Sequence, residues 1–186
     1  MNWLKRFWEF LNKDSWQSWT VFIILVILFI KLIFFPFIAL ITGTSLPLVI
    51  VESCSMYHAD SFENWWNSNG VWYENSNINK SEFQSYGLKN GLNKGDIVLV
   101  MGKKEYSKGD IIIFQAGKQY PLIHRIIQEN PLATKGDHNS GQLDVEQNIQ
   151  KEQILGKAVA KIPLVGWVKL IFYEPLKTEA ERGLCH

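Results

Sequence analysis

Residues 19–41, WTVFIILVILFIKLIFFPFIALI, are almost entirely apolar or aromatic, with Thr20, Lys31 and Pro36 as the exceptions. A helix needs roughly 20 such residues to cross the hydrocarbon core of a bilayer. Lys31 costs about 2.5–3.5 kcal/mol on insertion scales, but each surrounding Ile, Leu, Phe or Val returns about 0.3–0.6 kcal/mol. A cleaved signal peptide has a shorter apolar region, and a buried core helix is rarely apolar on every face. The run therefore predicts a transmembrane helix over residues 19–41.

The residues before this run predict its orientation. Residues 1–18 carry Lys5, Arg6 and Lys13 near the membrane, and positive charge tends to stay in the cytoplasm. Within them, residues 3–12 suit a short amphipathic helix at the lipid interface. We therefore expect a single-pass protein of the cell membrane with a cytoplasmic N-terminus and residues 42–186 outside the cytoplasm.

Charge and cysteine content exclude several classes of function. The formal net charge is only +1, so no broad basic surface favours nucleic acid as a partner. The histidines are scattered and no Cys/His spacing resembles a zinc site, so we expect neither a metal nor a cofactor. Cys54 and Cys185 are too few for a disulfide scaffold, and we expect Cys185, next to the C-terminus, to be mobile.

The exported part divides into an insertion and a set of strands. Residues 46–53 and the apolar runs that follow residue 95 are short and β-branched, and two of them open with Lys-Gly-Asp. Strand-like pieces are also expected on both sides of Pro163 and Gly166. Residues 57–93 are instead rich in Asn, Ser and aromatics, with Asp60 or Ser61 and Asn79 or Ser81 as candidate helix caps. We expect a mainly β domain with a small helical insertion.

The exported part also contains the residue types needed for serine hydrolysis. A serine hydroxyl needs a base near neutral pKa, an orienting carboxylate and donors for the oxyanion. The candidates are Ser53, Ser55, His124, Asp137 and Asp144. Each alone is commonly a turn residue or a hydrogen-bonded structural group.

Taken together and in order, these residues resemble the type I signal peptidases. ESCSM (52–56) is similar to the Ser-x-Ser-Met box of that family, and KGDIVLV (94–100) to the next box. KGDIIIF with HRII (108–127), TKGDHNSGQLD (134–144) and GKAVAKIPLVGWV (156–168) resemble the later boxes. The resemblance covers about residues 20–170, and His124 before Arg125 is similar to the archaeal and endoplasmic-reticulum branch with its Ser-His-Asp arrangement.

The resemblance implies a signal-peptidase-like antiparallel β catalytic domain that removes signal peptides from exported preproteins. Ser55 would be the nucleophile and His124 the general base, with Asp137 or Asp144 orienting the imidazole. The backbone N–H of Ser55 and the hydroxyl of Ser53 would form the oxyanion hole. Preprotein signal peptides and the lipid bilayer are the expected partners, and the secretion translocon is a further candidate.

Departures from the family pattern leave alternatives open. His58 is a second candidate base, although we expect an exposed residue that opens the insertion. Cys54 should face away from the site if Ser55 faces it, and Lys135 is expected to be solvated. The insertion is either a subdomain with its own aromatic core or a cap at the membrane or substrate. A catalytically silent membrane-tethered adaptor and a related serine peptidase with a regulatory substrate are the alternative functions.

Overall fold

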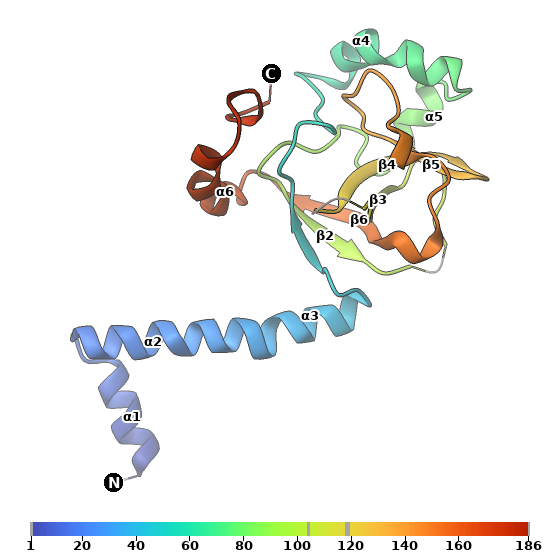
Figure 1. Cartoon of the computed structure of the whole chain (residues 1–186). Helices are drawn as coiled ribbons and strands as arrows, with labels where there is room; N and C mark the ends of the chain where they lie inside the picture. Colours follow the sequence, from blue (N-terminus) through green and yellow to red (C-terminus); the bar gives the residue numbers. More distant parts are fainter. Residues whose placement is uncertain (1, 104, 118–119, 186) are drawn as a thin grey trace. The chain divides into compact units, whose positions relative to one another are not determined.

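The computed structural model describes residues 2–103, 105–117 and 120–185 and divides the chain into two compact units, Met1–Ile41 and Thr42–His186. Figure 1 traces the elements of both units. Helices make up 41% of the structure and strands 18%, so the expectation of a mainly β chain is not supported. The N-terminal helices, the insertion and a C-terminal helix outweigh strands that are only three to nine residues long.

The first unit is helical. It contains α1 (Trp3–Leu11), α2 (Trp16–Phe29), the π-helical turn η1 (Ile30–Phe34) and α3 (Phe35–Thr42), whose last residue belongs to the second unit. Ser15 caps α2 by accepting a hydrogen bond from the Ser18 backbone N–H. The wide turn η1 ends two residues before Pro36, which has no N–H to donate to the carbonyl of Leu32.

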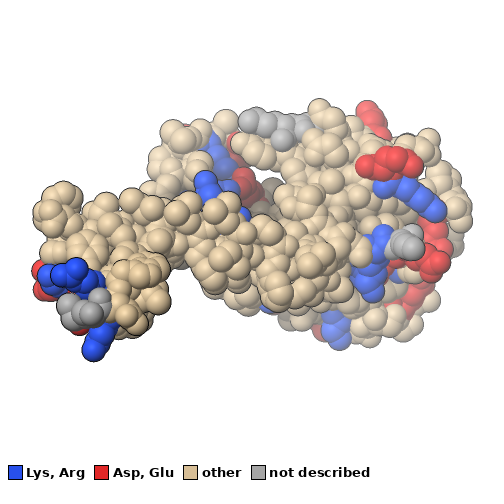
Figure 2. Space-filling view, turned by 90° about the horizontal axis from the view of Figure 1, so that it is seen from below, with Lys and Arg blue, Asp and Glu red and all other residues tan. Residues whose placement is uncertain are grey.

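Among the described residues, one continuous helix, Trp16–Thr42, is long and apolar enough to cross a membrane. The side chains of its most apolar stretch are not buried within the protein. On the face of this unit seen in Figure 2, the charged side chains gather at the end that carries α1. The helix predicted over residues 19–41 is therefore present, with three more residues at its N-terminal end and one more at its C-terminal end.

The second unit contains one six-stranded antiparallel sheet with the strand order β1-β2-β6-β3-β4-β5. Its strands are β1 (Leu48–Ile50), β2 (Ile97–Met101), β3 (Ile111–Phe114), β4 (Leu122–Glu129), β5 (Leu132–Lys135) and β6 (Ile154–Ile162). The antiparallel sheet agrees with the expectation from the β-branched runs. β1 and β5 are its edges, so one side of β1 carries backbone groups that no other strand of the sheet pairs.

The insertion forms two helices, α4 (Phe62–Asn75) and α5 (Lys80–Gln84), beside β4 and β5 (Figure 1). Ser61 and Asn79 are their caps, each accepting a backbone N–H with its side-chain oxygen. The buried aromatics Trp65, Trp66, Tyr73 and Phe83 pack together and against Ile127 of β4 and Ala133 of β5. The aromatic side chains thus form a core shared with the sheet, and not the separate core of its own that the first of the two expectations described.

The segment after β6 is a helix and not the expected strand. α6 (Trp167–Tyr173) begins where the Gly166 backbone N–H donates to the Gly95 carbonyl at 2.8 Å. Trp167 Nε1 then donates to the Lys94 carbonyl at 3.0 Å. A short apolar run is compatible with either element, and these contacts with the turn before β2 favour the helix. Short 3₁₀ turns complete the chain: η2 (Asp144–Glu146), η3 (Lys151–Gln153), η4 (Glu174–Leu176) and η5 (Glu179–Glu181).

Candidate active site

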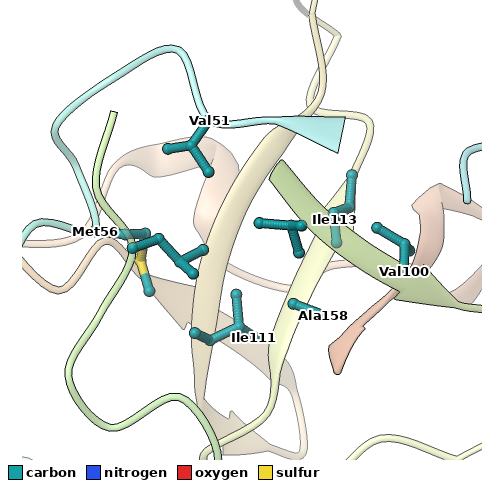
Figure 3. Packing of buried hydrophobic residues seen from close by; sticks show 8 residues of the cluster. Val51, Met56, Val100, Ile111, Ile113 and Ala158 are labelled. Atoms are coloured by element: carbon teal, nitrogen blue, oxygen red, sulfur yellow. The ribbon is translucent and has the colours of Figure 1, made fainter. Parts of the chain in front are cut away.

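The loop that contains Ser55 follows β1, and buried residues on both sides of Ser55 anchor it in the core. Val51 and Met56 are both buried, and they pack with Val100 of β2, Ile111 and Ile113 of β3 and Ala158 of β6 (Figure 3). Because the apolar neighbours of the loop are fixed in the core, the residues between them have little freedom. Ser55 is half-buried next to this anchor.

Backbone hydrogen bonds fix the loop further. The Ser55 carbonyl accepts the His138 N–H at 2.8 Å, and the Met56 carbonyl accepts the Leu92 N–H at 2.8 Å. The Tyr57 N–H donates to the Cys54 carbonyl at 3.0 Å, which closes a tight turn around Ser55. The Ser55 backbone is thus tied directly to the segment that contains Asp137.

β4 brings His124 to Ser55. Successive residues of a strand point to opposite faces, so His124 and its neighbour Arg125 enter different surroundings. The Ser55 hydroxyl lies 3.0 Å from Nε2 of His124, within hydrogen-bond reach. His124 is only 2% exposed. The pair expected from the sequence is therefore in contact, with the geometry that proton transfer requires.

The carboxylate beside His124 belongs to Glu146 in η2. Its Oε1 lies 2.5 Å from Nδ1 of His124, a close contact outside ordinary hydrogen-bond alignment. Both side chains are buried, and Oε2 of Glu146 accepts the Leu143 N–H at 2.6 Å. A carboxylate can only accept, so it favours the proton on Nδ1 and leaves Nε2 free to accept the serine proton.

Neither of the two expected aspartates contacts the imidazole of His124. Asp144 lies at the start of η2 and is exposed, and within the described part of the chain no residue pairs with its carboxylate. The 3₁₀ turn of η2 directs Glu146 inward while Asp144 stays at the surface. Sequence reasoning missed Glu146; its only signal was a second acidic residue two positions after Asp144 in the same polar loop.

Asp137 is the centre of a separate buried network. Its carboxylate accepts hydrogen bonds from Nε and NH2 of Arg125 at 2.8–3.2 Å and from the Tyr73 hydroxyl at 2.9 Å. His58 Nε2 lies 2.9 Å from the same carboxylate. Burial alone would raise the pKa of Asp137, but the Arg125 charge and the hydrogen bonds from His58 and Arg125 hold it well below its usual value. Asp137 is thus a permanently ionised anchor of the loop behind Ser55.

Two residues expected at the surface are buried in this network. His58 is 7% exposed, and its ring stacks on Trp65 with the centroids 3.7 Å apart. Burial lowers the pKa of His58, although Asp137 partly opposes this.

Lys135 is fully buried, with its ammonium 4.9 Å from the ring centroids of both Trp72 and Tyr73. Burial lowers the pKa of Lys135 to about 8. The expectations of an exposed His58 and a solvated Lys135 were wrong because the insertion supplies their partners.

Ser53 and Gly136 complete the surroundings of the nucleophile. The Ser53 hydroxyl is exposed and lies 3.2 Å from the Ser55 hydroxyl. Gly136 packs so closely that a Cβ there would lie 2.9 Å from both His124 Nε2 and the Ser55 carbonyl oxygen. The structure therefore brings Ser53, Ser55 and His124 together, and only a glycine fits behind them.

The hydroxyl of Ser55 faces two adjoining cavities. One, of about 720 Å³, runs between β1 and the start of β4, with Ile50, Val51, Met56 and Leu122 among its lining residues. The second, of about 480 Å³, lies between Leu122 and the loop 139–143. Ser53, Ser55, Leu122 and His124 line both cavities. The Ser55 hydroxyl is therefore in the middle of a continuous groove, one wall of which includes residues of the edge strand β1.

Cys185 is placed differently from expectation. Cys54 and Cys185 form a disulfide, with their Cα atoms 5.5 Å apart. Cys185 is therefore fixed beside the nucleophile loop and is not a mobile end of the chain. Within residues 2–103, 105–117 and 120–185, no group of three His, Cys, Asp or Glu side chains could hold a metal ion.

The sequence matches no model of a known protein family and no curated protein.

Proposed function

We propose that the chain is a membrane-anchored serine endopeptidase that cleaves signal peptides from exported preproteins. The observation that carries the proposal is the contact chain from Ser55 through His124 to Glu146 at the centre of a groove. The resemblance of the surrounding sequence boxes to the type I signal peptidases supplies the substrate class.

The chemistry follows from this arrangement. The Ser55 hydroxyl would attack the scissile carbonyl while His124 Nε2 takes its proton and Glu146 stabilises the resulting imidazolium. The Ser55 N–H and the Ser53 hydroxyl would donate to the oxyanion. His124 would then protonate the leaving amine, which gives an acyl-enzyme that water hydrolyses by the same route in reverse.

The groove suits an extended peptide. β1 is a sheet edge with backbone groups available for pairing, and its Leu48 and Ile50 line the apolar cavity together with Leu122. A substrate strand would add its main-chain hydrogen bonds to this edge and place small apolar side chains in the cavity. This is consistent with the small residues that the family resemblance implies before the cut.

The anchor and the disulfide support the proposed location. The Trp16–Thr42 helix would hold enzyme and membrane-bound precursor in the same bilayer, which raises their effective concentration. Lys5, Arg6 and Lys13 favour a cytoplasmic N-terminus. The Cys54–Cys185 disulfide favours an oxidising compartment for the second unit.

The test is processing of a precursor by the full chain reconstituted in liposomes. Ser55→Ala and His124→Ala should each lower the rate of signal-peptide removal at least about a thousandfold, because each removes a member of the reacting unit. Ser68→Ala is the matched control, since Ser68 is exposed on α4 and lines neither cavity beside Ser55. Processing at the full rate by both variants would refute the proposal, and it would favour the silent adaptor.

A further inference from the structure

The C-terminal residues 174–185, here called the tail, fold back onto the nucleophile loop. Cys185 is bonded to Cys54, the residue directly before Ser55. Lys177 Nζ donates to the Glu52 carbonyl at 3.1 Å. The tail is therefore attached to this loop at two points, one on each side of Ser53. Cys54 is joined by a covalent bond, and Glu52 by a hydrogen bond from a charged group.

The tail has an internal structure that holds its shape. The buried ammonium of Lys94 donates to Glu174 Oε2 at 2.7 Å and to the Glu181 carbonyl at 2.6 Å. The Gly183 N–H donates to Glu174 Oε2 at 2.8 Å. Arg182 donates to the carbonyls of Lys177 and Pro175. The tail is thus a folded segment anchored on the turn before β2.

A cavity of about 780 Å³ separates the tail from the nucleophile loop. Cys54, Leu176, Lys177 and Leu184 are among its lining residues. Glu52, Ser53, Tyr120 and Glu181 line both this cavity and the apolar cavity beside Ser55. The groove through the active site therefore continues past Ser53 and is closed on its far side by the tail.

We propose that the tail is a wall of the substrate groove, which binds the residues of an extended peptide that lie beyond those in the apolar cavity. The Cys54–Cys185 disulfide holds this wall in place, so recognition of long substrates depends on the oxidation state of the enzyme. This inference rests on the proposed peptidase function. It concerns the part of the groove that would distinguish long from short peptides, and not the residues that would carry out the reaction.

Reduction would release the end of the wall from the loop that contains Ser55 without touching the reacting groups, while the Lys94 contacts would still hold Glu174 and Glu181. A dithiol reductant would transfer two electrons and two protons, break the S–S bond and leave two thiols, while becoming a disulfide itself. The tail would then be held to the loop mainly through Lys177. An extended peptide advances about 3.3 Å per residue, so several substrate residues would lose one side of their binding site.

The experiment compares two internally quenched peptides with the full chain in detergent micelles. The short peptide spans only the cut site and the apolar cavity, and the long peptide extends it at both ends. Cys185→Ser and dithiol-treated wild-type enzyme should cleave the long peptide with kcat/KM lowered roughly tenfold. Cleavage of the short peptide should stay within about twofold of the oxidised wild type.

Further controls separate the outcomes. The dithiol should have no additional effect on Cys185→Ser. Lys177→Met should weaken cleavage of the long peptide although the disulfide remains, whereas Lys80→Gln in the insertion should leave that cleavage unchanged. Unchanged cleavage of both peptides would overturn the proposal, as would an equal loss on both, which would place the effect at Ser55. Full cleavage by Ser55→Ala would instead refute the serine mechanism itself.

Discussion

Oε1 of Glu146 lies 2.5 Å from Nδ1 of His124, on the opposite side of the ring from the Ser55 hydroxyl. The imidazole is thus placed between a group that would lose a proton and a group that would stabilise the charge it gains. Buried Asp137 instead balances Arg125. The two carboxylates have separate tasks, and this separation can be tested.

Glu146→Gln should lower kcat by about a hundredfold to ten-thousandfold, because an amide at this position can donate to Nδ1 and favour the wrong tautomer. Asp144→Asn is the matched control and should stay within about twofold of wild type, since the carboxylate of Asp144 is exposed. Steady-state cleavage of a peptide substrate measures both. A large loss in Asp144→Asn with little loss in Glu146→Gln would reverse the assignment.

Gly136→Ala should impair both folding and catalysis. Its Cβ would lie 2.9 Å from His124 Nε2 and from the Ser55 carbonyl oxygen, so the nucleophile and base must move apart. Overpacking of this kind costs about 1–3 kcal/mol of unfolding free energy. Gly141→Ala should be neutral, because no described atom lies within 4 Å of a Cβ there. Urea denaturation and kcat check the pair, and equal behaviour of the two variants would contradict the packing described.

Tyr73→Phe should destabilise the protein by about 1–3 kcal/mol, because it removes a donor to the buried, ionised Asp137. Tyr86→Phe removes a comparable hydroxyl that donates to the partly exposed Glu82 within the insertion, and it should cost less than about 1 kcal/mol. Chemical denaturation of both variants gives the comparison. Equal losses would mean that the insertion does not stabilise the loop behind Ser55.

Lys135 predicts a specific dependence of stability on pH. Burial holds its pKa at about 8 in the folded protein, below its ordinary value of 10.5. Between these values the unfolded chain binds more protons, so the free energy of unfolding should rise with pH. Burial raises the pKa of Tyr73 above its ordinary value of 10.0. The contribution of Tyr73 to the free energy of unfolding would therefore fall only at pH values above 10.0.

From pH 8 to pH 10 the wild-type protein should therefore gain roughly 1–2 kcal/mol from Lys135. Lys135→Met should lack this gain. Denaturation at a series of pH values measures both, and an equal rise in the variant would assign the effect to another group.

The sequence predicted the contact between Ser55 and His124 but not the carboxylate beside His124. Ser55 and His124 are each part of a box whose order along the chain constrains the fold. The choice among Asp137, Asp144 and Glu146 depends on which way the short η2 turn points, and nothing in the local composition determines that. The local sequence identifies a loop with two acidic residues, Asp144 and Glu146, but does not show which of their side chains points into the protein.

The fold shows the same limit of local reasoning. The long apolar helix, the caps Ser61 and Asn79 and most of the strands follow from short-range patterns. The burial of His58 and Lys135 depends on aromatic partners in the insertion, and the position of Cys185 depends on a residue 131 positions away. α6 likewise owes its form to contacts with Lys94 and Gly95. These outcomes depend on long-range contacts, which local patterns do not determine.

The central claim is that Ser55 forms a covalent acyl intermediate with the substrate. Rapid acid quenching of the enzyme during turnover, followed by peptide mapping by mass spectrometry, tests it directly. The account predicts a substrate acyl group on Ser55 in the wild-type protein and none in Ser55→Ala. An acyl group on Ser53, or turnover in Ser55→Ala with no acylated residue, would contradict it.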